Sequence, residues 1–197
     1  MEIKRIVFPV DFSVRARQSA PLVQAMARRF EASVELLHVL NYAPEVFGTL
    51  DYVGQAADVI SSEAFAKWRR EKETQLTELA GQGWAGIQVE TRVETGEIAS
   101  VILRRAKDAD LIMMPTHGYG PFRRMLLGSN TAKVLHDAPC AVWTDAHAGE
   151  EGAWRPEVIE RVLCAVDLED EKHDIRLLRA AGGFAQRWGA RLEVMHA

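Results

Sequence analysis

Apolar residues follow two different spacings along this chain, and segments with the two spacings alternate. Where apolar residues are consecutive, or alternate with polar ones, they predict strands. These strands cover residues 6–10, 34–40, 87–93, 110–114 and 140–143. Where apolar residues recur every three or four positions, they predict helices. These helices cover residues 14–30, 56–81, 96–107 and 129–136. Strands joined by helices predict an α/β fold, a doubly wound open parallel sheet with helices on both faces.

The apolar positions of the first three helices indicate which side of each helix faces the sheet. Ser13 is suited to cap the first helix, because a serine oxygen accepts hydrogen bonds from free N–H groups at a helix start. The inward positions are Leu22, Val23, Met26, Ala27 and Phe30 in the first helix, Phe65, Trp68, Leu76 and Leu79 in the second, and Ile98, Val101, Ile102 and Ala106 in the third.

The beginning of the chain recurs near its end. Residues 5–12 (RIVFPVDF) align with 161–168 (RVLCAVDL), and 34–38 (VELLH) align with 192–196 (LEVMH). The polar segment before the second copy, DAHAGEEGAWRPE, contains glycine and proline and predicts a linker. A repeat of this size indicates tandem domains.

We therefore expect a complete domain at 1–145, a linker at 146–159, and the first strand, helix and strand of a second, similar domain at 160–197. A segment of about 40 residues rarely folds alone. Either the chain is part of a longer protein, or the incomplete copy packs on something else.

Composition narrows the possible partners and the compartment. The 197 residues carry a net charge of −4, and this mildly acidic balance argues against nucleic acid as a partner. No apolar run approaches the ~18 residues of a membrane span, and the first residues lack the apolar stretch of a signal peptide. Cys140 and Cys164 lie within apolar runs, which predicts buried free thiols in a reducing compartment. We expect a cytoplasmic protein without a membrane partner.

Three polar segments are candidates for the chemistry. Asp11 follows the first strand, 115–118 (PTHG) follow the fourth, and Gly128 and Ser129 open the next helix. In a doubly wound sheet, ligands bind beyond the carboxyl ends of the strands, where the strand order reverses. The free N–H groups of a helix start attract phosphate, although the dipole contributes only ~0.3–2 kcal/mol. Asp11 can accept hydrogen bonds from an amino group or a ribose hydroxyl.

Each of these residues also has an ordinary structural interpretation. Asp11 could serve only as the cap of the first helix, and Ser129 could cap the helix that it opens. His117 could be a surface residue. Arg123 and Arg124 could neutralise phosphates, but a pair of charges in a loop is usually just solvated. Only the combination of segments indicates a function.

That combination resembles the universal stress protein family. The resemblance rests on Thr116, His117 and Gly118, then nine residues, then Gly128 and Ser129, followed by 132–142 (AKVLHDAPCAV). The opening at 4–13 (KRIVFPVDFS) resembles the family's first strand, as 96–99 (GEIA) and 109–114 (ADLIMM) resemble the later part. The resemblance spans 1–145, and its opening recurs at 160–197.

The resemblance implies a five-stranded sheet of the adenine-nucleotide α-hydrolase-like type and an ATP-binding regulatory protein of the stress response. The ATP-binding branch of the family has a glycine, two residues, a second glycine, nine residues, a third glycine, and a serine or threonine. Gly118, Gly128 and Ser129 match the later positions, but Pro115 replaces the first glycine. Because proline fixes φ and lacks an N–H donor, weaker or altered nucleotide binding is expected here.

By the same resemblance, Asp11 would contact adenine, Val39 would line the adenine pocket, and the loop and helix residues would hold ribose and phosphates. The ligand would be ATP, alone or with magnesium. The family commonly forms dimers through its last strand, here 140–144, and in a tandem protein the second copy could take the partner's place. The candidate binding residues are Pro9, Val10, Asp11, Val39, Met114, Pro115, Thr116, His117, Gly118, Gly128, Ser129, Asn130 and Thr131.

Three functions compete at this stage. The first is an ATP-binding regulator with weak hydrolysis at most, because no general base or complete metal site is evident near the phosphates. The second is a dimeric interaction module of the same fold that binds no nucleotide, which Pro115 favours. The third is a nucleotidyl transferase or ATP pyrophosphatase, but the first strand lacks the His-x-x-His or Ser-Gly-Gly motif of such enzymes.

The incomplete copy has no counterpart of Gly118 or Gly128, so Asp167 is not assigned to a site.

Overall fold

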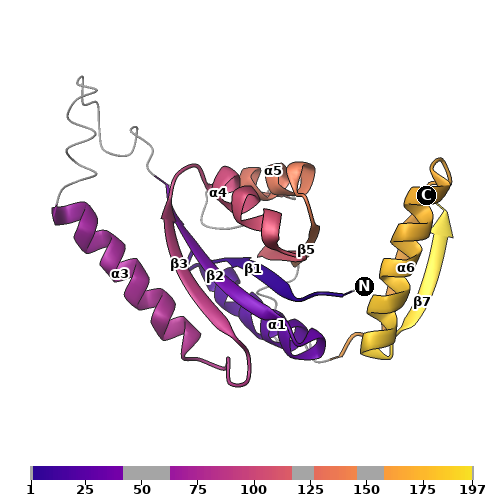
Figure 1. Cartoon of the computed structure of the whole chain (residues 1–197), viewed down its shortest axis with the longest axis horizontal. Coiled ribbons are helices and arrows are strands. Elements are labelled where there is room, and N and C mark those ends of the chain that lie inside the picture. The colour runs from indigo at the N-terminus through magenta and orange to yellow at the C-terminus, as the bar shows by residue number, and fades with distance from the viewer. Residues whose placement is uncertain (1, 42–62, 117–126, 146–157, 197) are drawn as a thin grey trace.

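The computed structural model describes residues 2–41, 63–116, 127–145 and 158–196. It confirms an α/β fold in which strands and helices alternate (Figure 1). The elements are β1 (Arg5–Pro9), α1 (Val14–Phe30), β2 (Ser33–Leu40), α3 (Glu63–Ala80), β3 (Val89–Thr95), α4 (Ile98–Arg105), the 3₁₀ turn η2 (Ala106–Asp108), β4 (Leu111–Pro115), α5 (Ser129–Asp137), β5 (Ala141–Asp145), β6 (Arg161–Val166), α6 (Glu171–Trp188) and β7 (Arg191–His196).

The first five strands form one parallel sheet in the order β3-β2-β1-β4-β5. Strand β1 lies at the centre, where Val7 is opposite Glu35 of β2 on one side and Ile112 of β4 on the other. The chain moves from β1 outward to β2 and β3, and then crosses back to β4 and β5. The strand order therefore reverses between β1 and β4.

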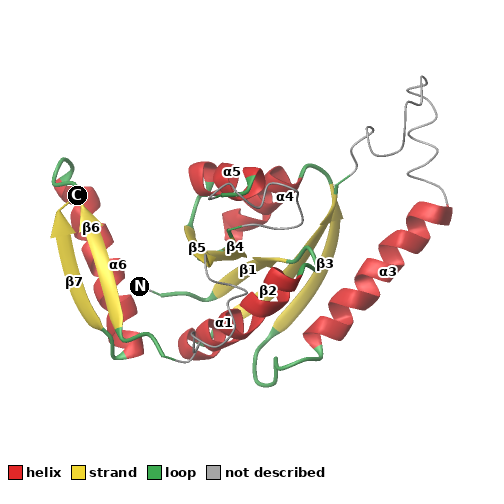
Figure 2. Ribbon diagram, turned by 180° about the vertical axis from the view of Figure 1, so that it is seen from behind, coloured by secondary structure: helices red, strands yellow, loops and turns green. Residues whose placement is uncertain are grey.

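Helices cover both faces of this sheet, with α1 and α3 on one face and α4 and α5 on the other (Figures 1 and 2). Side chains of a strand alternate between the faces, so Ile6 and Phe8 pack under α1 whereas Val7 packs under α4 and α5. The predicted inward positions of α1 are confirmed, since all of them are buried. In α4, Val101 and Ile102 are buried and Ile98 is half-buried.

Several predicted boundaries shift by one or two residues. The strand predicted at 87–93 runs from Val89 to Thr95. Ile87 instead closes a turn, in which its N–H donates to the carbonyl of the buried Trp84 at 3.0 Å and Gly86 has a φ of 77°. A shift of two residues keeps the same side chains on the same face, so alternation alone could not detect it. Of the helix predicted at 56–81, residues 56–62 lie outside the described part.

Two further strands begin one residue later than predicted. Asp110 was predicted to begin a strand, but its carboxylate accepts hydrogen bonds from the N–H groups of Lys4 and Arg5, at 2.7 and 3.0 Å, and β4 begins one residue later. Cys140 precedes β5 and is only half-buried, whereas Cys164 is buried in β6. Both are free thiols, as predicted.

The C-terminal unit, which we define as residues 158–196, contains a two-stranded parallel sheet, β6-β7, with α6 on one face (Figure 2). It packs on the N-terminal domain, where Phe184 of α6 contacts Phe30 of α1 and Trp143 of β5, with ring centroids 5.9 and 5.8 Å apart. That this unit begins a second domain of the same kind stays a prediction. Within the described ranges, no helix is both long and apolar enough to cross a bilayer.

Candidate functional site

The turn after β1 presents Asp11 at the carboxyl end of the sheet. Val10 is still hydrogen-bonded to the neighbouring strand β2, because its N–H donates to the Leu37 carbonyl at 2.8 Å. One carboxylate oxygen of Asp11 then accepts the N–H of Ser13 at 2.9 Å, and Phe12 between them adopts a left-handed φ of 59°. A non-glycine residue with this φ is uncommon and marks a tightly specified turn.

Asp11 does not cap the first helix. Ser13 is the N-cap, as predicted, since its hydroxyl oxygen accepts the N–H of Ala16 at 3.1 Å. The Asp11 carboxylate therefore shapes the turn that precedes the helix. A carboxylate has about four acceptor positions, and the bond to Ser13 occupies one of them.

The end of β4 is tied to the start of α5 by polar contacts. The Pro115 carbonyl accepts the hydroxyl of the buried Thr131 at 3.3 Å, and the Thr116 carbonyl accepts the N–H of Gly128 at 2.9 Å. Thr116 also donates its N–H to the carbonyl of Asp145 in β5, at 3.4 Å. Pro115 is the last residue of β4 and is buried, and because it has no N–H it donates no hydrogen bond to a neighbouring strand.

Among the residues that the structure describes, no side chain caps the start of helix α5. Gly128 is its N-cap, with φ −70° and ψ 150°, and Ser129 is the first helical residue. The alternative role of Ser129 as the cap is therefore wrong. Ser129 is exposed and Asn130 is half-buried, whereas Thr131 is buried. The first N–H groups of a helix have no acceptor within it, so this start offers the backbone donors that bind phosphate groups.

The topology brings these two ends together. Val7 is opposite Ile112, and continuing that offset places Asp11 level with Thr116. The described candidates Pro9, Val10, Asp11, Met114, Pro115 and Thr116 therefore border the junction of β1 and β4, where the strand order reverses.

Two further groups of candidates differ in what the structure shows of them. Val39 of β2 is half-buried on the sheet face that α4 and α5 cover, the same face as the start of α5. The candidates His117 and Gly118 lie outside the described residues, and so do Arg123 and Arg124.

A cluster that the sequence did not assign to the site supports the Asp11 turn. His38 of β2 places its Nδ1 2.6 Å from the Val10 carbonyl, and its ring lies 4.7 Å from the ring of Phe12. Lys72 of α3 holds its ammonium 5.0 Å from the centre of the Phe12 ring, a favourable cation–π distance. The one available signal was that this histidine recurs as His196 in the aligned segments.

Burial sets the charge of His38. Desolvation lowers the pKa of His38, and the positive charge of Lys72 lowers it further, against the opposing effects of the Val10 carbonyl and Asp11. The neutral ring is therefore favoured, and its Nδ1–H donates to Val10. This bond fixes the backbone directly before Asp11.

An ion pair joins the cap of α4 to α5. Glu97 caps α4 and also binds Lys133 of α5, at 3.2 Å. The hydrogen bond from the Ser100 hydroxyl, with further bonds from backbone N–H groups and Lys133, lowers the pKa of Glu97 to about 2. Among the described residues, no three acidic, histidine or cysteine side chains are grouped to hold a metal ion.

Comparisons with known proteins identify the family. The model of the universal stress protein family matches residues 2–144. A universal stress protein from Methanocaldococcus jannaschii is 31% identical over 144 residues, which cover 71% of this chain and 79% of that protein. The chain belongs to the universal stress protein family. A second relative from Thermus aquaticus is 30% identical over 142 residues and is covered over 96% of its length.

Solved structures of universal stress proteins share this fold. One from Archaeoglobus fulgidus aligns with 99% of this chain and 66% of its own, at a TM-score of 0.70 and 22% identity. Another, solved in complex with cAMP, aligns with 74% of this chain at a TM-score of 0.53 and 17% identity. At these low identities, the structural similarity shows the fold of the chain and nothing about its ligands.

Proposed function

We propose that this universal stress protein binds an adenine nucleotide, ATP with or without magnesium, and acts as a regulatory protein of the stress response. The observation that carries the proposal is that Asp11 follows β1, while the start of α5 is bonded to the end of β4, the strand next to β1. A carboxylate that would accept hydrogen bonds from a base or ribose, and backbone N–H groups that would bind phosphates, thus border one junction. That a family member was solved in complex with cAMP supports a nucleotide as the ligand.

Each part of the site would have a distinct task. Asp11 would accept hydrogen bonds from the adenine or ribose, and Val39 would provide an apolar wall for the base. Ser129, exposed in the first turn of α5, would donate its hydroxyl to a phosphate oxygen. The backbone N–H groups at 129–131 and the proposed contacts of His117 and Gly118 would complete the phosphate site.

Pro115 is the observation that favours the alternative, an interaction module of the same fold that binds no nucleotide. It stands where the ATP-binding motif has its first glycine and supplies no N–H donor. In the structure, however, its carbonyl holds Thr131 and so fixes the start of α5. Proline at this position is thus compatible with an ordered start of α5, which the proposed phosphate site requires.

The same proposal covers location and assembly. Both cysteines are free. This supports a cytoplasmic location, because thiols stay reduced in that compartment. Strand β5 is at the end of the sheet order and pairs only with β4 among the described strands. It would pair with a second chain in a homodimer, or with a second copy of the domain within one protein.

The test is the thermal unfolding midpoint with and without Mg-ATP. A ligand at 100 times its Kd adds ~2.7 kcal/mol to the stability of the folded state, which raises the midpoint by roughly 5–10 °C for a chain of this size. Gly128→Asp should abolish the rise, because a carboxylate at the N-cap repels phosphate. Gly81→Asp is the matched control, since Gly81 is exposed beyond the end of α3.

A rise in the wild type and in Gly81→Asp that is absent in Gly128→Asp supports the proposed site. If millimolar Mg-ATP raises none of the three midpoints while all three proteins are folded, nucleotide binding is wrong and the interaction module replaces it. If Mg-ATP does raise the wild-type midpoint, repeating the titration with ADP and cAMP ranks the nucleotides.

A further inference from the structure

An exposed ion pair lies near the carboxyl edge of the sheet, on the face that α4 and α5 cover. Glu97 comes two residues after β3 and caps the start of α4. One of its carboxylate oxygens lies 3.2 Å from the ammonium of Lys133 in α5. The side chains of Lys133 and Glu97 are 48% and 50% exposed, so both charged groups are accessible from solvent.

Lys133 lies on the same side of α5 as Ser129. Residues four positions apart are neighbours on a helix surface, and both of these residues are exposed. Lys133 is about 6 Å further along the helix axis, and helical side chains lean toward the N-terminus. The flexible four-carbon stem of Lys133 therefore leads back toward the first turn of α5, where the proposed function places the phosphates of the ligand.

Glu97 is ionised at neutral pH. The hydrogen bond from the Ser100 hydroxyl, with further bonds from backbone N–H groups and Lys133, lowers the pKa of Glu97 to about 2. Lys133 is thus held by a full negative charge. A phosphate monoester carries a charge of about −1.5 to −2 at pH 7, which is more than a carboxylate carries. A phosphate at the start of α5 therefore competes with Glu97 for the ammonium.

Packing of α4 on α5 does not depend on this pair. Ala99 and Ile102 of α4 and Val134 of α5 belong to one buried apolar cluster. These apolar contacts join the two helices, whereas an exposed ion pair adds little to stability. The pair can therefore open while the two helices stay packed.

We propose that Lys133 is a specificity-determining residue of the nucleotide site, and that its ammonium exchanges Glu97 for a phosphate of the bound ligand. The inference rests on the proposed function and adds a ligand class to it, because the site then takes adenine nucleotides in preference to the nucleoside. Asp11 and Val39 would recognise the adenosine end of the ligand, and Lys133 would recognise the charge at the other end.

The test is isothermal titration calorimetry of the full chain with Mg-ATP and with adenosine. Lys133→Met keeps an unbranched apolar side chain but removes the charge. It should weaken ATP binding about tenfold, the low end for a hydrogen bond to a charged group, and leave adenosine binding unchanged. The ATP affinity of this variant should also depend less on salt, because one charge contact that salt screens has been removed.

Glu97→Gln tests the same exchange from the other partner. Glutamine keeps an oxygen that accepts N–H groups at the start of α4, but it no longer attracts the ammonium by charge. ATP binding should become about two- to fivefold tighter, because an exposed ion pair no longer competes with the phosphate. Adenosine binding should not change.

Lys107→Met is the matched control. Lys107 is an exposed lysine of η2, which follows α4 at the opposite edge of the sheet. Its replacement changes the charge of the protein by the same amount and should leave the affinities for ATP and adenosine unchanged. The thermal midpoints of all variants without ligand verify that each is folded.

A loss of ATP affinity in Lys133→Met but not in Lys107→Met, with adenosine binding unchanged, supports the proposal. Equal losses for ATP and adenosine, or an unchanged salt dependence, overturn Lys133 as a specificity residue while nucleotide binding stands. An ATP affinity that does not increase in Glu97→Gln overturns the exchange. If the wild type binds neither ligand, the proposed function fails and this inference fails with it.

Discussion

The first and the last strand–helix–strand units share their backbone geometry but differ in burial. Asp11 and Asp167 both accept the N–H of the residue two positions on, at 2.9 and 3.0 Å. The residue after each aspartate is left-handed, with φ of 59° at Phe12 and 61° at Leu168. Yet Leu168 is 67% exposed, whereas Phe12 packs against His38. Equivalent local sequence has produced equivalent turns in very different surroundings.

A second difference in burial concerns the sheet face that carries Val7 and Leu37 in the N-terminal domain. Leu37 of β2 is fully buried, whereas its counterpart in β7, Met195, is 44% exposed. Likewise Val7 of β1 is buried, but its counterpart Leu163 is 62% exposed. In the N-terminal domain α4 and α5 cover this face, and no described helix covers it in the C-terminal unit (Figure 1). Local geometry follows local sequence, whereas burial depends on elements distant in the chain.

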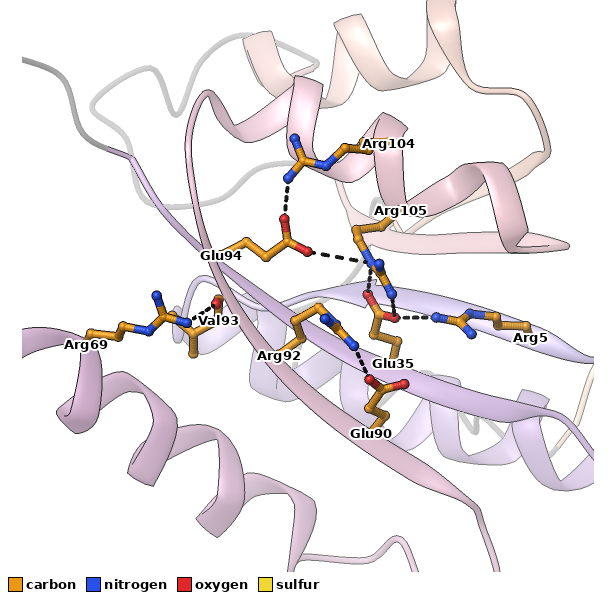
Figure 3. A network of polar contacts seen from close by, with 9 residues as sticks. All are labelled: Arg5, Glu35, Arg69, Glu90, Arg92, Val93, Glu94, Arg104 and Arg105. Atoms are coloured by element: carbon orange, nitrogen blue, oxygen red, sulfur yellow. Dashed lines mark hydrogen bonds and ion pairs between the residues drawn. The ribbon is translucent and has the colours of Figure 1, made fainter. Parts of the chain in front are cut away.

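The same contrast governs a pair of glutamates at equivalent positions. Glu35 of β2 is 1% exposed and binds Arg5 at 2.5 Å and Arg105 at 2.6 Å (Figure 3). Its counterpart in β7, Glu193, pairs only with Arg191 among the described residues, at 3.3 Å near the surface. Arg105 belongs to α4, so the helix that buries Glu35 also supplies a charge that balances it.

The largest difference between the units is expected from core truncation. Leu36 of β2 is fully buried, and its counterpart Val194 of β7 is 53% exposed. Leu36→Ala should lower the free energy of unfolding by about 3–5 kcal/mol, and Val194→Ala by less than about 1 kcal/mol. Urea unfolding followed by circular dichroism measures both. Equal losses would mean that another surface covers β7 in solution.

The glutamates should show the next largest difference. Glu35→Ala leaves Arg5 and Arg105 without their shared carboxylate and should cost about 3 kcal/mol, the lower end for a broken buried pair because both arginines reach solvent. Glu193→Ala removes a surface ion pair and should cost less than about 1 kcal/mol. The measurement is again urea unfolding at neutral pH.

Acid should reproduce the loss at Glu35. Burial raises the pKa of Glu35, but hydrogen bonds and charge from Arg105 and Arg5 outweigh it, so the pKa lies below its usual 4.5. The unfolded state therefore binds the proton first. Stability from this group is complete above pH 4.5 and is lost as the pH falls through the lowered value. A Glu35→Gln variant should lack this part of the acid dependence, and an unchanged profile would contradict the assigned network.

The smallest effect is expected at the two histidines. The pKa of His38 lies below its usual 6.5 because burial disfavours the charged ring. Its stabilising contribution is complete above pH 6.5 and is lost as the pH falls through the lowered value. His38→Asn keeps an N–H donor for the Val10 carbonyl but does not titrate. The free energy of unfolding of this variant should therefore depend less on pH below 6.5. His196→Asn is the control. An equal reduction of the pH dependence in both variants would contradict a specific contribution from His38.

The sequence predicted those features that depend on pattern and order. Alternating apolar runs and helical spacings gave the five strands of the domain and the buried stripe of α1, because burial on a face requires that period. Because parallel strands end at one edge, the sequence also predicted that Asp11 and the residues after β4 border one junction, and the structure shows that β1 and β4 are neighbours. The N-cap Ser13 followed from its position alone.

Other features depend on contacts that no local pattern encodes. In the sequence, Glu35 has the pattern of an ordinary polar residue of a strand. Only the hydrogen bond from Arg105, seventy positions away, shows that it is buried and paired. Lys72 reaches Phe12 from α3, and His38 binds Val10 across the sheet. The role of Ser129 as first helical residue rather than cap depended on a one-residue choice between Gly128 and Ser129, and both types are accepted at caps.

Strand β5 has a consequence for how signals could travel in this protein. Trp143 contacts Phe184 of the C-terminal unit, and two residues later the Asp145 carbonyl accepts the N–H of Thr116 beside the candidate site. One five-residue strand thus touches both places. Thermodynamic linkage is reciprocal. If ligand binding changes the free energy of docking of the C-terminal unit through β5, docking must change the free energy of ligand binding by the same amount.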